Sequence, residues 1–181
     1  MADRRGKKKR QRRNHEELRT TSEHLEYEFQ MLVDTARAID SERFDRKGML
    51  HRALVESHLI HTRNMLDFLY PDPCKARTND VIADDYFDDP DEWEQVRPRI
   101  QDLGQLQSRI SKLLAHLTYY RQKLDRNWYS QPVTDQIVAA FEKFLHAASE
   151  TTLNEGLRKL KGAKVKLQRD TFSLRRSRTD D

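Results

Sequence analysis

The sequence predicts an all-α protein, built as a single four- to five-helix bundle with basic ends. Apolar residues recur at alternating spacings of three and four through most of the chain, which is typical of helices with one buried face. No segment shows the strict alternation of a strand. The 181 residues, 36% hydrophobic and 35% charged, suffice for one domain with a modest core. We expect a disordered basic arm over 1–13, the bundle over 14–155, and a flexible basic tail over 156–181.

Charge is distributed very unevenly along the chain. Residues 1–13 hold eight Lys/Arg and one Asp, and residues 156–181 hold nine Lys/Arg and three Asp. Because the whole chain carries only +4, the middle must carry −9. The basic ends are expected either to bind RNA or another polyanion, or to fold back onto the acidic body. The expected phosphate-binding cations of the arm are Arg4, Arg5, Lys7, Lys8, Lys9, Arg10, Arg12 and Arg13.

The first helix is predicted over about 15–40. Asn14 and Glu17 have the spacing of a capping box, in which each side chain satisfies a free backbone amide at the helix start. The buried seam should follow the 4-3 repeat from there. Its members are Leu18, Ser22, Leu25, Phe29, Leu32, Ala36 and Ile39.

A second helix is predicted over about 46–70, and it is apolar or uncharged nearly all round, which favours a central, largely buried position. Its expected apolar contacts are Leu50, Leu54, Leu59, Ile60, Met65, Leu66, Phe68 and Leu69. Its charges fall on one line, formed by Arg52, Glu56, Arg63 and Asp67. Arg63 and Asn64 are therefore candidate substrate-binding residues, and a buried ion-pair network is the alternative.

A long connection follows, because Pro71 and Pro73 stop the helix and four of the five prolines lie between 71 and 98. Its acidic loop, Asp80–Glu94, holds eight acidic residues and no Lys or Arg. The apolar residues of 81–83 and 86–87 are expected to pack on the bundle, and 90–93 to begin a helical turn. The loop itself is expected to be solvated, to shield a site from RNA phosphate, or to receive a basic tail.

The clearest heptad predicts a helix over about 99–125, and it runs through Leu103, Leu106, Ile110, Leu113, Leu117, Tyr120 and Leu124. Pro132 fits the first turn of a fourth helix. The expected buried face of that helix is Val133, Ile137, Phe141, Phe144 and Ala148. A weaker helix is predicted over about 150–161.

Arg109 and His116 are the candidate catalytic pair. They are seven residues apart on the third helix, so the side chains lie almost in line, roughly 10 Å apart along the axis. An arginine can hold developing phosphate charge and an imidazole can move a proton. Lys112, Tyr119 and Lys123 lie near the same border of the apolar stripe and are candidate substrate-binding residues. The alternative is a solvated helix flank with a half-buried histidine.

This segment resembles the HEPN superfamily of helical domains, whose hallmark is an arginine, four to six residues, and a histidine late in the bundle. Arg109-x6-His116 and the layout of about 45–150 are similar to that pattern. The resemblance implies metal-independent RNA cleavage across a dimer, with His116 transferring the proton near the ribose 2′-OH and Arg109 stabilising the phosphorane-like charge. Many relatives only bind RNA, so an inactive RNA binder is implied equally. An antitoxin-like protein partner is also implied.

Two further function classes remain open on the residues alone. The first is a non-enzymatic helical interaction domain with basic docking tails. The other is a metal-binding bundle using His51, His58, His61 and His116, because His58 and His61 share a helix face. No Walker loop, dinucleotide fingerprint, nucleophile elbow or Cys/His zinc pattern occurs, so we assign no metal ligand and no cofactor.

The single cysteine, Cys74, excludes an internal disulfide and fits a reducing compartment. No apolar run approaches the length of a membrane span, and the basic start is followed by a polar segment rather than a signal-peptide core. We therefore expect a cytoplasmic protein without membrane contact. The heptad seams also predict a homodimer.

Overall fold

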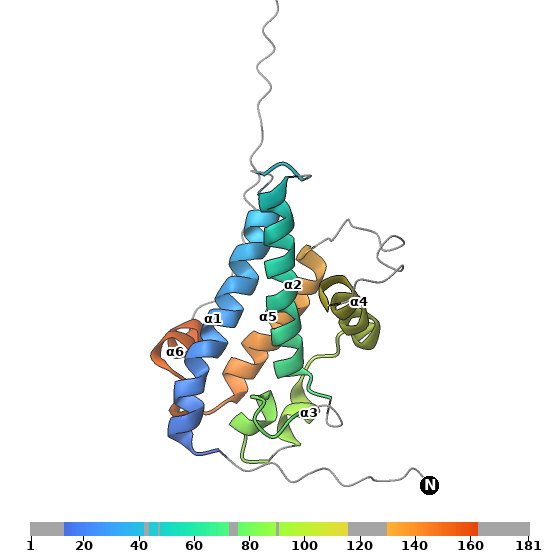
Figure 1. The fold of residues 1–181 in the computed structure, drawn as a ribbon. Helices are drawn as coiled ribbons and strands as arrows, with labels where there is room; N and C mark the ends of the chain where they lie inside the picture. Colours follow the sequence, from blue (N-terminus) through green and yellow to red (C-terminus); the bar gives the residue numbers. More distant parts are fainter. Residues whose placement is uncertain are drawn as a thin grey trace, which may run out of the picture.

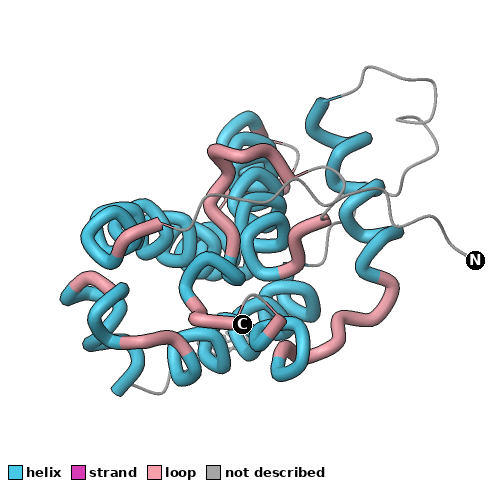
Figure 2. The backbone as a smooth tube through the Cα atoms, turned by 90° about the horizontal axis from the view of Figure 1, so that it is seen from below, coloured by secondary structure: helices cyan, strands magenta, loops and turns pink. Residues whose placement is uncertain are grey.

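The structure is a computed structural model that describes residues 13–41, 44–46, 48–72, 76–89, 91–115 and 130–162. Within these ranges the chain is helical and forms no strand, as predicted (Figures 1 and 2). The α-helices are α1 (His15–Asp40), α2 (Met49–Leu69), α3 (Glu92–Val96), α4 (Leu103–Ala115), α5 (Ser130–Ala147) and α6 (Glu155–Gly162). Two short 3₁₀ turns, η1 (Ala83–Tyr86) and η3 (Glu150–Thr152), lie between them.

Helix α1 begins at the predicted capping box. The Asn14 side chain accepts a hydrogen bond from the Glu17 amide at 2.8 Å, and the Glu17 carboxylate accepts one from the Asn14 amide at 3.0 Å. The predicted seam is buried from Leu18 to Ala36, and Ile39 at its end is only partly buried. Local sequence alone therefore places both the start and the buried face of this helix.

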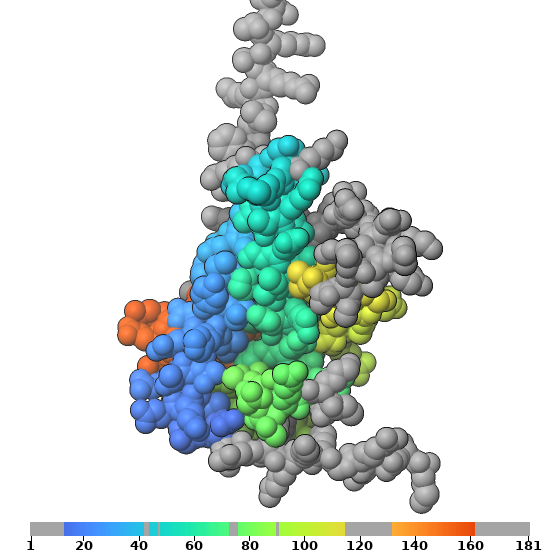
Figure 3. Space-filling model, in the orientation of Figure 1, coloured from blue at the N-terminus to red at the C-terminus, as the bar shows by residue number. Residues whose placement is uncertain are grey.

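Helix α2 departs from the sequence expectation in its first half. Met49 and Leu50 in its first turn are 80% and 58% exposed, and Ile60 just past its middle is 46% exposed, whereas Met65 and Leu66 near its end are fully buried. Figures 1 and 3 give the reason: the tip of the α1–α2 hairpin lies beyond the end of α5, so α5 does not cover the outer turns of α2. The expectation of a helix buried nearly all round was wrong for this half, because burial depends on how far the neighbouring helices extend.

The connection after α2 folds back against the bundle. Ile82, Ala83, Tyr86 and Phe87 are buried as predicted, whereas Val81 is 38% exposed. The helical turn expected at 90–93 becomes α3, whose Trp93 is fully buried.

The aromatic centre of the core is the ring of Phe144 on α5. Five rings surround it at centroid distances of 5.0 to 5.9 Å. Four come from α2, η1, α3 and their connections, namely Phe68, Tyr86, Phe87 and Trp93, and the fifth is Phe141 of α5 itself. Because Tyr86, Phe87 and Trp93 come from the connection, the acidic segment is part of the folded domain rather than a detached loop. This packing fixes the carboxylates that flank those aromatic residues against the base of the bundle.

The bundle extends beyond residue 155, where we expected a flexible tail to begin. Leu157 of α6 is fully buried against the core, and Asn154 caps the helix by accepting a hydrogen bond from the Leu157 amide at 2.9 Å. The Asn154 amide nitrogen of the side chain also donates to Glu26 on α1 at 2.6 Å. Figure 1 shows α6 lying beside α1, on the side opposite to α4. The boundary therefore moves to at least 162, because a cap and one buried leucine hold this basic helix in place.

Candidate functional site

Helix α4 presents one half of the candidate catalytic pair. Arg109 is partly buried beside the fully buried Ile110, and Lys112 is exposed one turn further along. Arg109 therefore lies at the border of the buried stripe, as the heptad predicted. His116, Tyr119 and Lys123 lie outside the described residues, so the distance between Arg109 and His116 stays a prediction.

The other substrate-binding candidates lie on the outside of α2. Arg63 and Asn64 are both exposed, and Arg63 Nε lies 3.5 Å from Asp67 Oδ2 in a pair whose side chains are 46% and 57% exposed. Asn64 Nδ2 donates to Glu28 Oε2 at 3.0 Å. The alternative of a buried ion-pair network is therefore wrong for this line, because all four of its charged side chains are exposed. These two side chains are placed for surface contact and not for an enclosed site.

The two histidines proposed to share a metal face have separate partners. His58 is fully buried, with Nδ1 at 3.1 Å from Thr35 Oγ1 and Nε2 at 3.4 Å from Thr134 Oγ1. His61 Nδ1 instead lies 2.7 Å from Glu28 Oε2. No group of three His, Cys, Asp or Glu side chains suited to a metal occurs among the described residues. The rings of His58 and His61 thus serve helix packing, and His51 is only partly buried near the outer end of α2.

Burial sets the protonation state of His58. Loss of hydration lowers the pKa of its imidazole from 6.5 to about 4, partly offset by a hydrogen bond to the Leu32 carbonyl, and the nearby His61 lowers it further. The Thr35 hydroxyl donates to the Met31 carbonyl at 2.6 Å, so its oxygen is an acceptor for the Nδ1–H of the neutral ring. His58 is therefore a neutral, structural histidine that joins α1, α2 and α5.

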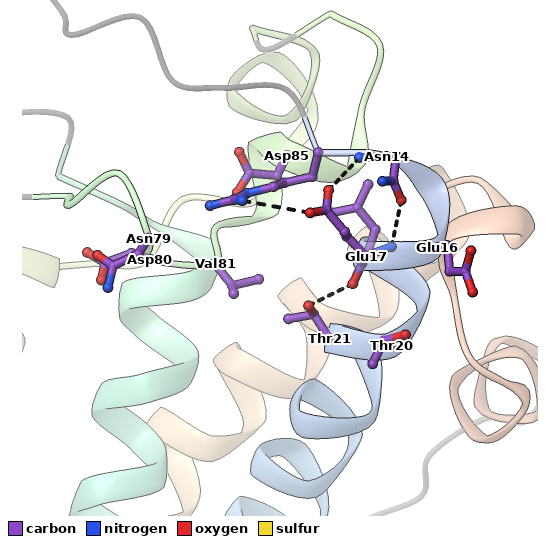
Figure 4. Close-up of a pocket in the computed structure, with 11 residues that line it drawn as sticks. Asn14, Glu16, Glu17, Thr20, Thr21, Asn79, Asp80, Val81 and Asp85 are labelled. Atoms are coloured by element: carbon purple, nitrogen blue, oxygen red, sulfur yellow. Dashed lines mark hydrogen bonds and ion pairs between the residues drawn. The ribbon is translucent and has the colours of Figure 1, made fainter.

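The largest cavity that we describe lies at the start of α1, facing the segment before η1. Its volume is about 470 Å³, and Figure 4 shows carboxylates around it that come from both segments, Glu17 from α1 and Asp80 and Asp85 from the connection. It is lined by Arg13, Asn14, Glu16, Glu17, Leu18, Thr20, Thr21, Asn79, Asp80, Val81 and Asp85. Backbone amides fix the carboxylates, since Asp80 Oδ2 accepts from Arg77 N at 2.7 Å and Asp85 Oδ2 from Ile82 N at 3.3 Å.

A second cavity of about 220 Å³ adjoins the first. The two share Arg13, Leu18 and Asp85, and the smaller one adds the acidic side chains Asp88 and Glu92. Arg13 is held at this junction. Its Nη2 donates to the Thr78 carbonyl at 3.2 Å, and its Nη1 lies 4.0 Å from Glu17 Oε1. Of the arm residues predicted to bind phosphate, Arg13 is described, whereas Arg4 to Arg12 lie outside the described residues.

Periodicity could not have revealed these cavities, because they form between segments about 65 residues apart in sequence. The one available signal was the excess of carboxylates in 80–94, which the sequence analysis interpreted as a loop that could receive a basic tail. Neither cavity is lined by Arg63, Asn64, Arg109 or Lys112. The predicted site residues and the cavities are thus separate features of the surface.

No family model matches the chain, and neither do any curated proteins or solved structures. None of the described helices combines the length and the apolar character needed to cross a membrane.

Proposed function

We propose that this chain is an RNA-directed helical domain with a HEPN-like active helix, acting as a metal-independent endoribonuclease or as an RNA binder. The observation that carries the proposal is the position of Arg109 on α4, partly buried at the border of the stripe that buries Ile110, with Lys112 exposed nearby. A partly buried guanidinium is held more rigidly than one on a free surface, which suits it to a phosphate that develops charge.

His116, seven residues further along the sequence, would supply the proton transfer. Arg109 would stabilise the charge on the phosphorane-like species, and the basic ends of the chain would supply salt-sensitive, sequence-independent affinity. A homodimer would bring two such helices together. A cytoplasmic location and a protein partner that restrains the activity, such as an antitoxin, are consistent with this role.

The test is cleavage of a mixed RNA pool in EDTA by the full chain, with His116→Ala and Arg109→Gln beside the wild type. Each change is expected to slow cleavage by about 100-fold or more, because one removes the proton-transfer group and the other the charge-stabilising donor. The matched controls are His146→Ala, an exposed histidine on α5, and Arg99→Gln, an exposed arginine just before α4. Both controls should retain wild-type rates.

Three outcomes separate the possibilities. Cleavage lost only in His116→Ala and Arg109→Gln supports the ribonuclease. RNA binding without cleavage in any variant leaves an RNA binder, provided that the affinity falls steeply with salt. Equal cleavage by wild type and His116→Ala overturns the assignment of this helix as the active one.

A helical protein-interaction domain is the second candidate. It is favoured by the exposure of Met49 and Leu50 at the tip of the α1–α2 hairpin, and by the engagement of Arg63 and Asn64 with neighbouring carboxylates. Absence of both RNA binding and cleavage in the wild type would support this candidate over the first.

A further inference from the structure

We propose that the two adjoining cavities at the base of the bundle are the docking groove for the chain's own basic arm, residues 1–12, and that this contact is autoinhibitory. The groove is here defined by the residues that line the two cavities. Docking is a property of the chain alone and does not depend on the proposed function, whereas its autoinhibitory effect rests on the proposed RNA binding. It identifies a third role for the acidic segment, beyond core packing and connection.

The first argument is charge. Six different carboxylates line the groove, from the first turn of α1, the segment around η1 and the start of α3: Glu16, Glu17, Asp80, Asp85, Asp88 and Glu92. Among the described Lys and Arg side chains, only Arg13 lines it. The carboxylates are spread over both cavities rather than gathered at one point. They form no metal-binding group among the described residues. Such a distribution matches a row of separate guanidinium and ammonium groups better than one ion.

The second argument is Arg13, which shows how the groove holds a cationic side chain. Its guanidinium donates to the Thr78 carbonyl and lies beside the Glu17 carboxylate, at the junction of the two cavities. Because Arg13 donates to the backbone carbonyl of Thr78, this hydrogen bond does not occupy any of the groove carboxylates. Arg13 is also the last residue of the basic run, so residues 1–12 are covalently joined to the body at the groove.

The third argument is the tether. A twelve-residue segment spans up to about 35 Å when extended, so the whole groove is within its reach. A short tether gives an effective concentration in the millimolar range, at which several weak, exposed ion pairs suffice for docking. The seven Lys/Arg among residues 1–12 then compete for the groove and for any external polyanion. An arm held in the groove is unavailable to RNA.

The test uses the full chain, with Cys74→Ser and a nitroxide attached through Ala2→Cys. Docking is expected to broaden the amide resonances of Thr20, Thr21 and Val81 at low salt, and this broadening should be lost at about 0.5 M salt, where ion pairs are screened. A chain of the same length in which all seven Lys/Arg of residues 1–12 are changed to Gln supplies the broadening caused by the tether alone.

Two of the six groove carboxylates are then neutralised by Glu17→Gln with Asp85→Asn. Both changes are isosteric, and their amide oxygens can still accept the backbone hydrogen bonds that the carboxylates accept. The matched control is Glu23→Gln with Asp34→Asn, two exposed carboxylates on α1 that line neither cavity. The groove variant should fall to the tether-only level, and the control should keep the wild-type broadening.

Two results overturn the proposal: wild-type broadening equal to that of the neutral arm, or equal broadening in the groove variant and its control. The comparison with the neutral arm requires no change in the groove, so it decides the question even if the groove variant folds poorly. RNA affinity is measured on the same proteins. If RNA binds, the groove variant should bind several-fold more tightly than the control. If RNA does not bind to any of them, the proposed function fails while the docking result stands.

Discussion

The Nδ1 atom of His58 on α2 lies 3.1 Å from the hydroxyl oxygen of Thr35 on α1, inside the interface between the two longest helices. The other ring nitrogen faces Thr134 on α5 at 3.4 Å. Three helices therefore meet on one neutral imidazole that water does not reach. A buried histidine of this kind makes the stability of the bundle depend on pH, and this dependence gives the first prediction.

The free energy of unfolding should fall as the pH is lowered from about 6.5 towards 4. The pKa of His58 is about 4 in the folded chain, and an unfolded histidine has a pKa near 6.5, so over this window the unfolded chain binds the proton and the folded chain does not. The expected loss between pH 7 and pH 5 is about 2 kcal/mol. Urea unfolding of wild type and His58→Leu at the two pH values measures it.

The His58→Leu variant should lose this pH dependence, whatever its own stability at pH 7. His146→Ala, which removes an exposed histidine on α5, should keep the wild-type dependence. A wild-type slope in His58→Leu would show that another group controls the acid response.

The second prediction concerns Gly156, at the start of α6. A β-carbon at this position would overlap the carboxylate of Glu26, and Asn154 holds that carboxylate at 2.6 Å. Gly156→Ala should therefore destabilise the chain by about 1 kcal/mol, although alanine normally favours a helix by about that amount. Thermal unfolding followed by circular dichroism measures the change.

Removal of the Glu26 carboxylate should reverse the sign of the effect of Gly156→Ala on stability. In a Glu26→Ala background, Gly156→Ala is expected to be neutral or stabilising, because only the helix propensity of alanine then remains. Additive effects of the two changes would contradict the steric explanation.

The third prediction concerns Trp93, which anchors the acidic segment to the end of α2. Its indole Nε1 donates to the Leu69 carbonyl at 2.7 Å, and both residues are fully buried. Trp93→Phe should lower the free energy of unfolding by about 2 kcal/mol, because it removes the donor from a buried carbonyl and reduces the packed volume. Urea unfolding measures it, and the exposed Val81→Thr serves as the control in the same segment. A loss below about 0.5 kcal/mol would show that the Leu69 carbonyl finds another donor.

The hydrogen-bond partner of Tyr70 could not be predicted from the sequence, just as the exposure of the outer turns of α2 could not. Tyr70 follows directly after the helix, and its hydroxyl donates to the Pro98 carbonyl at 2.8 Å, across 28 residues of chain. Burial raises the pKa of this phenol to about 12, and the nearby Arg97 partly offsets that effect. The sequence predicted the end of α2 at this position from the prolines, but it contained no signal for the partner of Tyr70.

The sequence predicted only part of the candidate site. The heptad around Ile110 placed Arg109 at the border of the buried stripe, and the structure describes it there. The pairing of Arg13 with the Thr78 carbonyl could not be predicted, because it joins segments 65 residues apart that have no shared pattern. The alternative of a buried ion-pair network through Arg63 was wrong for a related reason. Arg63 is exposed while Thr62 and Met65 beside it are buried, so tertiary packing decides which face of α2 is covered.

The sequence by itself determined the helices of this protein. Helix starts, seams and breaks depend on capping side chains, on spacings of three and four, and on prolines, all of which act within a few residues of each other. The tertiary structure alone decided which helix faces are covered, which neutral histidine joins α1, α2 and α5, and where carboxylates gather into a groove. These features depend on contacts between distant segments, whose geometry is set when the faces pack together and not by any local pattern.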